Sequence, residues 1–208
     1  MSTKYYDWSA YHASMRGDKV AIVDLDTQEE VTYGALEDRA SRLAEWLQSQ
    51  GVIKGDRVTL LTPNCPEVFE AQFACSKIGA ICIPLNWRLT VPELEYILGD
   101  SAPKVLIYDA KFAEAAEQLI SLCCVPSSLL LDAEDAACTY KQTLAALTGA
   151  YDGAECTLDD VAMIMYTSGT TGHPKGAMIT FGMNFYNAVN LGIPAGISAN
   201  AVQLVVLP

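Results

Sequence analysis

The chain has 208 residues, 51% of them hydrophobic, so it is long enough to bury a substantial core as one large domain or two small ones. Its 25 acidic and 13 basic side chains give a formal net charge of −12, which argues against nucleic acid and anionic membranes as general partners. An anion site in this chain must therefore be local, built from backbone N–H groups and a few side chains.

The N-terminus and the cysteines indicate the cellular compartment. Residues 1–7 contain no apolar core of a secretory signal, and no apolar run approaches the roughly 18–20 residues of a membrane-spanning helix. The seven cysteines are an odd number without a Cys-x-x-Cys pair, and the two histidines are far apart in the sequence. We therefore expect reduced thiols in a cytoplasmic protein and no zinc site. The sequence does not indicate an oligomeric state.

Residues 1–131 alternate between strand and helix patterns. Strands are expected at 20–25, 29–33, 57–61, 80–84, 104–108 and 128–131. Helices are expected from Leu36 to a stop at Gly51, from Pro66 (with Asn64 as candidate N-cap) to Gly79, from the capping-box residue Thr90, and from about 109 to 120. Such alternation predicts an α/β fold: a mostly parallel sheet flanked by helices in αβα layers.

Residues 132–160 differ from the lobe before them, because they contain seven acidic side chains and a single basic one, Lys141. We expect an acidic, solvated connector with one helix near 140–147. The acidic run is typical of a soluble surface rather than of a metal site.

The last segment, 161–208, is apolar. Buried strands are expected at 161–165 and 177–180, a helix at 181–191, and another buried strand at 202–208. Because an uncapped apolar strand at a chain end exposes its edge, we expect 1–208 to be the front portion of a larger domain.

Between the first two of these strands lies a polar loop rich in glycine. Residues 166–177 contain four serine or threonine side chains, three glycines and Lys175, the only formally charged side chain between 161 and 208. Glycines bring backbone N–H groups close to an anion, hydroxyls add donors, and a lysine adds a mobile positive charge. An isolated lysine would be expected to extend into water from a surface turn, but the surrounding serine, threonine and glycine residues favour a phosphate site.

The loop is not a Walker A motif. That motif needs Gly-Lys-Ser/Thr in direct succession at the start of a helix. Here His173 and Pro174 separate Gly172 from Lys175, and Gly176 and a strand-like run follow.

Residues 166–177, Tyr-Thr-Ser-Gly-Thr-Thr-Gly-His-Pro-Lys-Gly-Ala, resemble the phosphate-binding signature of the adenylate-forming enzymes, which include acyl-CoA synthetases, peptide-synthetase adenylation domains and luciferases. Further segments that resemble motifs of this superfamily lie at 31–36, 55–58, 63–67, 79–86 and 207–208. The resemblance covers nearly all of the chain, but only the front portion of the family's large domain.

The resemblance implies a reaction in which a carboxylate attacks the α-phosphorus of Mg·ATP and coenzyme A then displaces AMP. It assigns the phosphate contacts to Thr167, Ser168, Gly169, Thr170, Thr171, Gly172 and Lys175. Lys175 matches the loop lysine and is the catalytic candidate, and the Thr167 hydroxyl is a candidate Mg²⁺ ligand. His173 stands where the family varies and receives no role, and Phe181 stands where many members have histidine.

The substrate and the activity are less constrained. Residues 84–89 resemble members that act on fatty acids, which favours a fatty or other acyl acid over an aryl or amino acid, although the same residues also suit a strand end and a turn. Other readings are a non-catalytic nucleotide-binding fragment or pseudoenzyme, and an α/β domain whose loop binds nothing. Since the remaining parts of the family's site would follow Pro208, we expect little ligase activity from these 208 residues alone.

Overall fold

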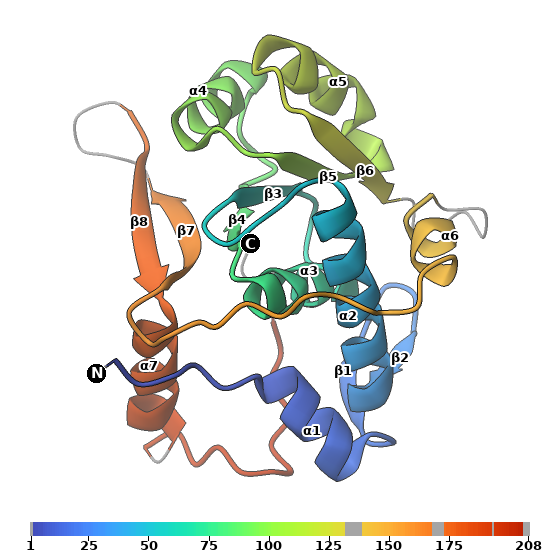
Figure 1. The fold of residues 1–208 in the computed structure, drawn as a ribbon, viewed down its shortest axis with the longest axis vertical. Helices are drawn as coiled ribbons and strands as arrows, with labels where there is room; N and C mark the ends of the chain where they lie inside the picture. The colour runs from blue at the N-terminus through green and yellow to red at the C-terminus, as the bar shows by residue number, and fades with distance from the viewer. Residues whose placement is uncertain (1, 132–138, 168–172, 193, 206–208) are drawn as a thin grey trace.

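The computed structural model describes residues 2–131, 139–167, 173–192 and 194–205 (Figure 1). The strands are β1 (Val20–Val23), β2 (Glu30–Thr32), β3 (Arg57–Leu61), β4 (Ile81–Pro84), β5 (Val105–Asp109), β6 (Ser127–Leu131), β7 (Val161–Thr167) and β8 (Lys175–Thr180). The helices are α1 (Trp8–Arg16), α2 (Tyr33–Ser49), α3 (Pro66–Ile78), α4 (Val91–Ser101), the 3₁₀ turn η1 (Ala110–Phe112), α5 (Ala113–Leu122), α6 (Thr139–Ala145) and α7 (Phe181–Gly192).

Six strands form one sheet in the order β6-β5-β3-β4-β7-β8, and β1 and β2 form a separate antiparallel hairpin. Every neighbouring pair in the large sheet is parallel except β7 and β8. The predicted α/β fold with a mostly parallel sheet is therefore confirmed. The central crossovers run through helices, as parallel strands require.

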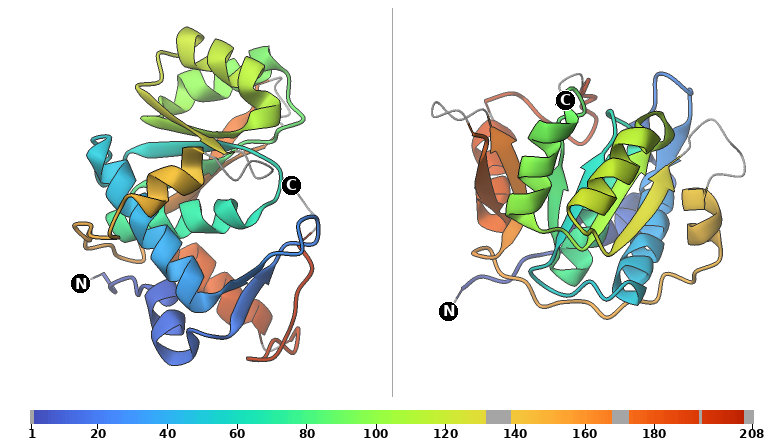
Figure 2. Two further views of the ribbon diagram at one scale, coloured as in Figure 1. Left: turned by 90° about the vertical axis from the view of Figure 1, so that its right-hand side faces the viewer. Right: turned by 90° about the horizontal axis from the view of Figure 1, so that it is seen from above.

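Helices cover both faces of this sheet, and each face has its own apolar core. Seen from above, α4 and α5 lie over the near face, whereas α2, α3 and α6 lie beyond the sheet (Figure 2, right). Leu94, Ile97 and Leu98 of α4 pack on the first face with Leu106 and Leu119. The second core is larger and joins apolar residues of α2, α3, α6 and the strands. These are the predicted αβα layers.

Most helix ends follow the predicted signals. Thr90 and Glu93 form a capping box at the start of α4, Pro66 occupies the first turn of α3, and Gly79 ends α3 with φ of 70°. The N-cap prediction for α3 was wrong by one residue, because Cys65 rather than Asn64 has the extended cap conformation. Helix α1 carries no strong apolar stripe and was not predicted; the Asp7 carboxylate caps it by accepting the Ala10 N–H at 3.1 Å.

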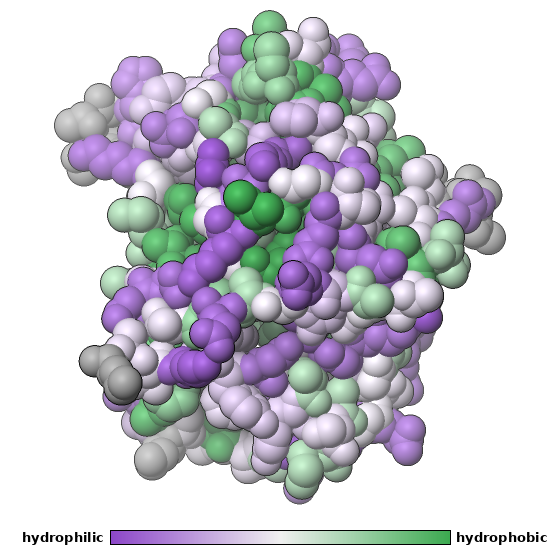
Figure 3. All heavy atoms as spheres, viewed as in Figure 1, coloured by the Kyte–Doolittle hydropathy of each residue, from purple (hydrophilic) through white to green (hydrophobic). Residues whose placement is uncertain are grey.

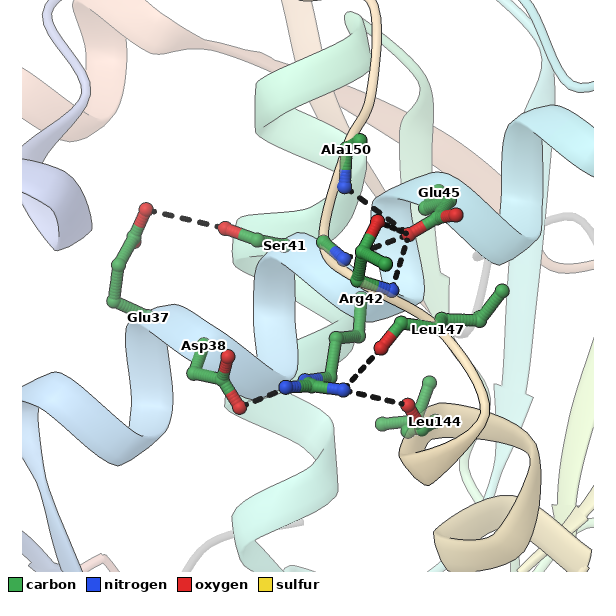
Figure 4. A network of polar contacts seen from close by, with 10 residues as sticks. Glu37, Asp38, Ser41, Arg42, Glu45, Leu144, Leu147 and Ala150 are labelled. Atoms are coloured by element: carbon green, nitrogen blue, oxygen red, sulfur yellow. Dashed lines mark hydrogen bonds and ion pairs between the residues drawn. The ribbon is translucent and has the colours of Figure 1, made fainter.

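Part of the acidic segment, within its described residues 139–160, is docked on α2. Tyr140 and Leu144 of α6 are buried in the core. Figure 4 shows the polar contacts that continue this docking: Arg42 of α2 donates to the carbonyl oxygens of Leu144 and Leu147, and the Glu45 carboxylate accepts the N–H groups of residues 148–150 at 2.7–3.1 Å. The helix expected near 140–147 is present as α6, whereas residues 148–150 are bonded to α2 through their backbone and not only to solvent.

Two expectations of burial in the last segment were also wrong. Strand β8 lies at the edge of the sheet beside β7 alone, and four of its six residues are exposed. Of the strand expected at 202–208, residues 202–205 form no strand and Val202 is 97% exposed, whereas 206–208 lie outside the described residues. Exposed large apolar side chains are therefore frequent toward this end of the described chain. The face viewed in Figure 3 mixes polar and apolar residues and has a small apolar area near its middle.

Candidate functional site

The candidate site is the mouth of the β7–β8 hairpin. Strand β7 ends at Thr167 and β8 begins at Lys175, and these two residues are direct partners in the antiparallel register. Directly paired residues project from the same face of a sheet. The structure thus brings together the two described members of the predicted phosphate site on one face. The other predicted members, Ser168, Gly169, Thr170, Thr171 and Gly172, lie outside the described residues.

The hairpin opens at the carboxyl edge of the parallel strands. Strand β7 runs parallel to β4, with Cys82 opposite Met163, so Thr167 and Pro84 end their strands at the same edge of the sheet. In open α/β sheets this edge is where ligands bind, because side chains and loops from several strand ends meet there. Thr167 and Lys175, the described ends of β7 and β8, therefore lie at the edge where this fold class binds its ligands.

The electrostatics of the mouth suit an anion. Lys175 is exposed, and within the described ranges its ammonium group has no ion-pair partner. Lys77, by contrast, is fully buried and pairs with Asp7 at 2.8 Å and Glu37 at 2.6 Å. The Thr167 hydroxyl likewise accepts and donates no hydrogen bond within the described part of the chain. A cation and a hydroxyl without intramolecular partners can both turn toward a phosphate group.

In the described part of the chain the acidic side chains do not gather into a metal site. The described residues contain no group of three or more His, Cys, Asp or Glu side chains that could hold a metal ion. Mg²⁺ commonly binds through few protein ligands together with substrate phosphates. The single free hydroxyl of Thr167 fits that kind of coordination.

Helix α4 contacts both arms of the hairpin, which the sequence did not indicate. The Tyr166 hydroxyl donates to Asp100 Oδ2 at 2.6 Å. The imidazole of His173 stacks on Tyr96, with ring centroids 4.8 Å apart and planes 22° from parallel. Burial and the neighbouring Asp100 carboxylate raise the pKa of Tyr166 above its usual value, so its hydroxyl remains protonated as a donor. The only sequence signal for these contacts is the four-residue spacing of Tyr96 and Asp100, which places both side chains on one face of α4.

Residues 84–89, which resemble fatty-acid-activating members, form the end of β4 and the turn before α4. Asn86 Oδ1 accepts the Arg88 N–H at 3.1 Å, and the Arg88 guanidinium lies 4.2 Å from the centre of the Trp87 ring. This is the strand end and turn that the alternative reading expects. The preference for a fatty acid stays a prediction. None of the helices in the described ranges has the length and apolar character of a membrane span.

Comparisons with known proteins agree with this arrangement. A family model described as "AMP-binding enzyme" matches residues 10–208. Feruloyl-CoA synthase of an Amycolatopsis species is 40% identical over 203 residues, which cover 97% of this chain and 38% of that protein. The long-chain-fatty-acid–CoA ligase FadD13 of Mycobacterium tuberculosis is 38% identical over 162 residues, covering 77% and 31%.

A solved structure of a similar protein shares the fold of this chain. The crystal structure of a putative long-chain-fatty-acid CoA ligase from Rhodopseudomonas palustris superposes with a TM-score of 0.85 at 28% identity, covering 96% of this chain and 50% of that chain. The chain thus spans well under half the length of the two curated relatives named above.

Proposed function

This chain belongs to the AMP-binding enzyme family, and we propose from that membership that it supplies the ATP-phosphate loop of a ligase that joins a carboxylic acid to coenzyme A. The acid is first activated as its acyl-adenylate with release of pyrophosphate, and the thiol of coenzyme A then displaces AMP. The relatives that match most of this chain are named as CoA ligases or CoA synthases, which supports this reaction class.

One observation carries the proposal furthest: Thr167 and Lys175 are register partners at the mouth of the hairpin, and neither has an intramolecular polar partner in the described ranges. In the proposed reaction negative charge builds on the leaving pyrophosphate. The Lys175 ammonium would neutralise that charge at the β- and γ-phosphates. Mg²⁺, when bound, would share this neutralisation, and Thr167 is the described residue that fits as its ligand.

The acid is proposed to be a fatty or other acyl acid, on the resemblance of residues 84–89. Feruloyl-CoA synthase, which is 40% identical to this chain, is named for an aryl acid, and an aryl acid is therefore the second candidate. We also propose a cytoplasmic location, which is supported by the free thiols of the six cysteines in the described ranges.

The test uses the complete gene product, with pyrophosphate release measured against a panel of fatty acids, ferulate and amino acids. Titration calorimetry measures ATP affinity in parallel. We expect Lys175→Ala to weaken ATP binding by about 10- to 100-fold, because a charge-assisted contact of about 1.5–3 kcal/mol is lost. Turnover with the preferred acid should fall at least as far.

Lys4→Ala is the matched control, since Lys4 is a highly exposed lysine that pairs only with Glu155 at the surface. It should leave both measurements unchanged. ATP binding without pyrophosphate release from any acid would support a non-catalytic nucleotide-binding protein instead. Equal ATP affinity for wild type and Lys175→Ala would contradict the assignment of the loop.

A further inference from the structure

We propose that α4 is a positioning platform for the phosphate loop, with Tyr166, Asp100, Tyr96 and His173 pinning the two arms of the β7–β8 hairpin to one face of the helix. The inference rests on the proposed function, because it concerns the same loop. It assigns a role in ATP binding to side chains that do not contact the phosphates themselves.

The first pin is on the β7 arm. Tyr166 directly precedes Thr167, and its ring leaves the face of the hairpin opposite to Thr167 because side chains alternate along a strand. Its hydroxyl reaches Asp100 at 2.6 Å. Fixing Tyr166 on α4 therefore fixes the direction in which Thr167 points on the other face.

The second pin is on the opposite arm. His173 lies two residues before Lys175, and its imidazole stacks on the Tyr96 ring at a centroid separation of 4.8 Å. Tyr96 and Asp100 are four residues apart, so they share one face of α4. The two contacts thus bracket the loop residues 167–172, one on each side, from a single helix face.

The platform itself is rigidly mounted. The N-terminus of α4 is closed by the Thr90–Glu93 capping box, and its apolar face is buried in the core. At the other end the Arg57 guanidinium donates to the carbonyl oxygens of Ser101 and Ala102 at 2.6 and 2.8 Å. A helix held at both ends and along one face is a fixed reference for the hairpin.

Elsewhere the hairpin stands away from α4. A hollow of about 320 Å³ lies between them, lined among others by Arg57, Ile164 and Met178. If the pins were removed, the end of the hairpin that extends past its pairing with β4 would have room to move into this hollow. Restricting both arms before ATP arrives lowers the conformational entropy lost on binding, which raises affinity.

The test compares Tyr96→Ala and Asp100→Ala with wild type in the complete gene product. Hydrogen–deuterium exchange is followed in peptides covering 161–180, and ATP affinity is measured by calorimetry. We expect faster exchange in these peptides and about fivefold weaker ATP binding for each variant, the loss of one ordinary hydrogen bond or ring contact. Peptides from α2 and β3 should exchange as in wild type.

Conservative variants separate positioning from general stability. Tyr96→Phe keeps the stacking ring and Asp100→Asn keeps an acceptor oxygen, so both should restore the exchange and the affinity. Tyr186→Ala, an exposed tyrosine of α7, is the control and should change neither.

Unchanged exchange in Tyr96→Ala and Asp100→Ala would overturn the pinning without any reference to nucleotide. Faster exchange with unaltered ATP affinity would overturn its role in binding. A wild-type protein that binds no ATP would instead overturn the proposed function, and the positioning role with it; the wild-type titration alone identifies that case.

Discussion

At the scale of single residues, Gly176 shows how tightly the hairpin mouth is built. Gly176 lies on β8, directly opposite Tyr166 of β7. A Cβ atom at this position would lie 2.8 Å from Ile164 Cγ2 and 3.1 Å from Tyr166 Cζ, both closer than ordinary contact. The missing side chain lets the Tyr166 ring lie across β8 on its way to Asp100. Glycine is needed here for space rather than for an unusual backbone angle.

We therefore expect Gly176→Ala to destabilise the protein by about 1–2 kcal/mol through overpacking, measured by urea unfolding. It should also speed hydrogen exchange at Tyr166. Gly99→Ala is the control, because Gly99 is a helical glycine with no atom within 4 Å of a built Cβ. That change should be neutral or stabilising by up to about 1 kcal/mol. Equal stability of Gly176→Ala and wild type would show that the ring can move aside without cost.

At the scale of elements, α6 illustrates a helix that depends on one buried polar contact. Its seven residues are too few to form a stable helix alone. Tyr140 is buried, and its hydroxyl donates to the Glu70 carboxylate of α3 at 2.6 Å. Glu70 is itself fully buried and also receives Arg39 at 3.3 Å. Burial raises the pKa of Glu70, against the opposing effect of the Tyr140 hydrogen bond.

Tyr140→Phe keeps the ring and removes only the hydroxyl, leaving the buried carboxylate with one donor fewer. We expect a loss of about 1–3 kcal/mol in the free energy of unfolding. Exchange should quicken in residues 139–147 before it does in the sheet. Tyr186→Phe, which removes an exposed hydroxyl, should be within about 0.5 kcal/mol of wild type. A neutral Tyr140→Phe would mean that the Tyr140–Glu70 hydrogen bond adds nothing to the other contacts of α6, which are its apolar packing and the bond from Arg42.

At the scale of the whole molecule, buried Lys77 joins three separate parts of the chain. It lies on α3 and pairs with Asp7 before α1 and with Glu37 of α2. Burial is the largest single effect and acts to raise the pKa of Asp7, but the hydrogen bonds from Lys77, Ala10 and Ser9 together with the Lys77 charge outweigh it, so the pKa lies below its usual 3.8. Burial likewise acts to lower the pKa of Lys77, yet the two carboxylates raise it above 10.5.

The sign of the pH dependence follows. A carboxyl with a lowered folded pKa stabilises the fold above its unfolded value, and this contribution is lost as pH falls through the folded pKa. We expect Asp7→Asn to be less stable than wild type at neutral pH, with a difference that shrinks as pH falls below 3.8.

Urea unfolding at a series of pH values measures this difference. In a Lys77→Met background the loss of stability from Asp7→Asn at neutral pH should be smaller than in wild type, because the Lys77 hydrogen bond and charge no longer lower the Asp7 pKa, although the bonds from Ala10 and Ser9 remain. A pH-independent difference in the wild-type background would contradict the role of the ion pair.

Predictions from the sequence were most accurate where the signal is local. Strand β3 has the predicted bounds, and the capping box of α4 and the glycine end of α3 are where their residues indicate, because caps, turns and periodicity depend on neighbours within a few positions. The composition and order of residues in the loop likewise indicated phosphate chemistry and the family. Burial of β8 was predicted wrongly, because apolar content alone does not say whether a strand is central or at an edge.

The tertiary structure alone decided which distant residues meet. Tyr166 and Asp100 are 66 positions apart, and Tyr140 and Glu70 are 70 apart, so no periodic pattern relates them. The docking of residues 148–150 on Glu45 is equally long-range. The amino-acid sequence by itself determined the family and most of the elements, and it predicted the phosphate loop. Only the tertiary structure placed α4 against both arms of the hairpin, because strand order and helix placement depend on contacts across the whole chain.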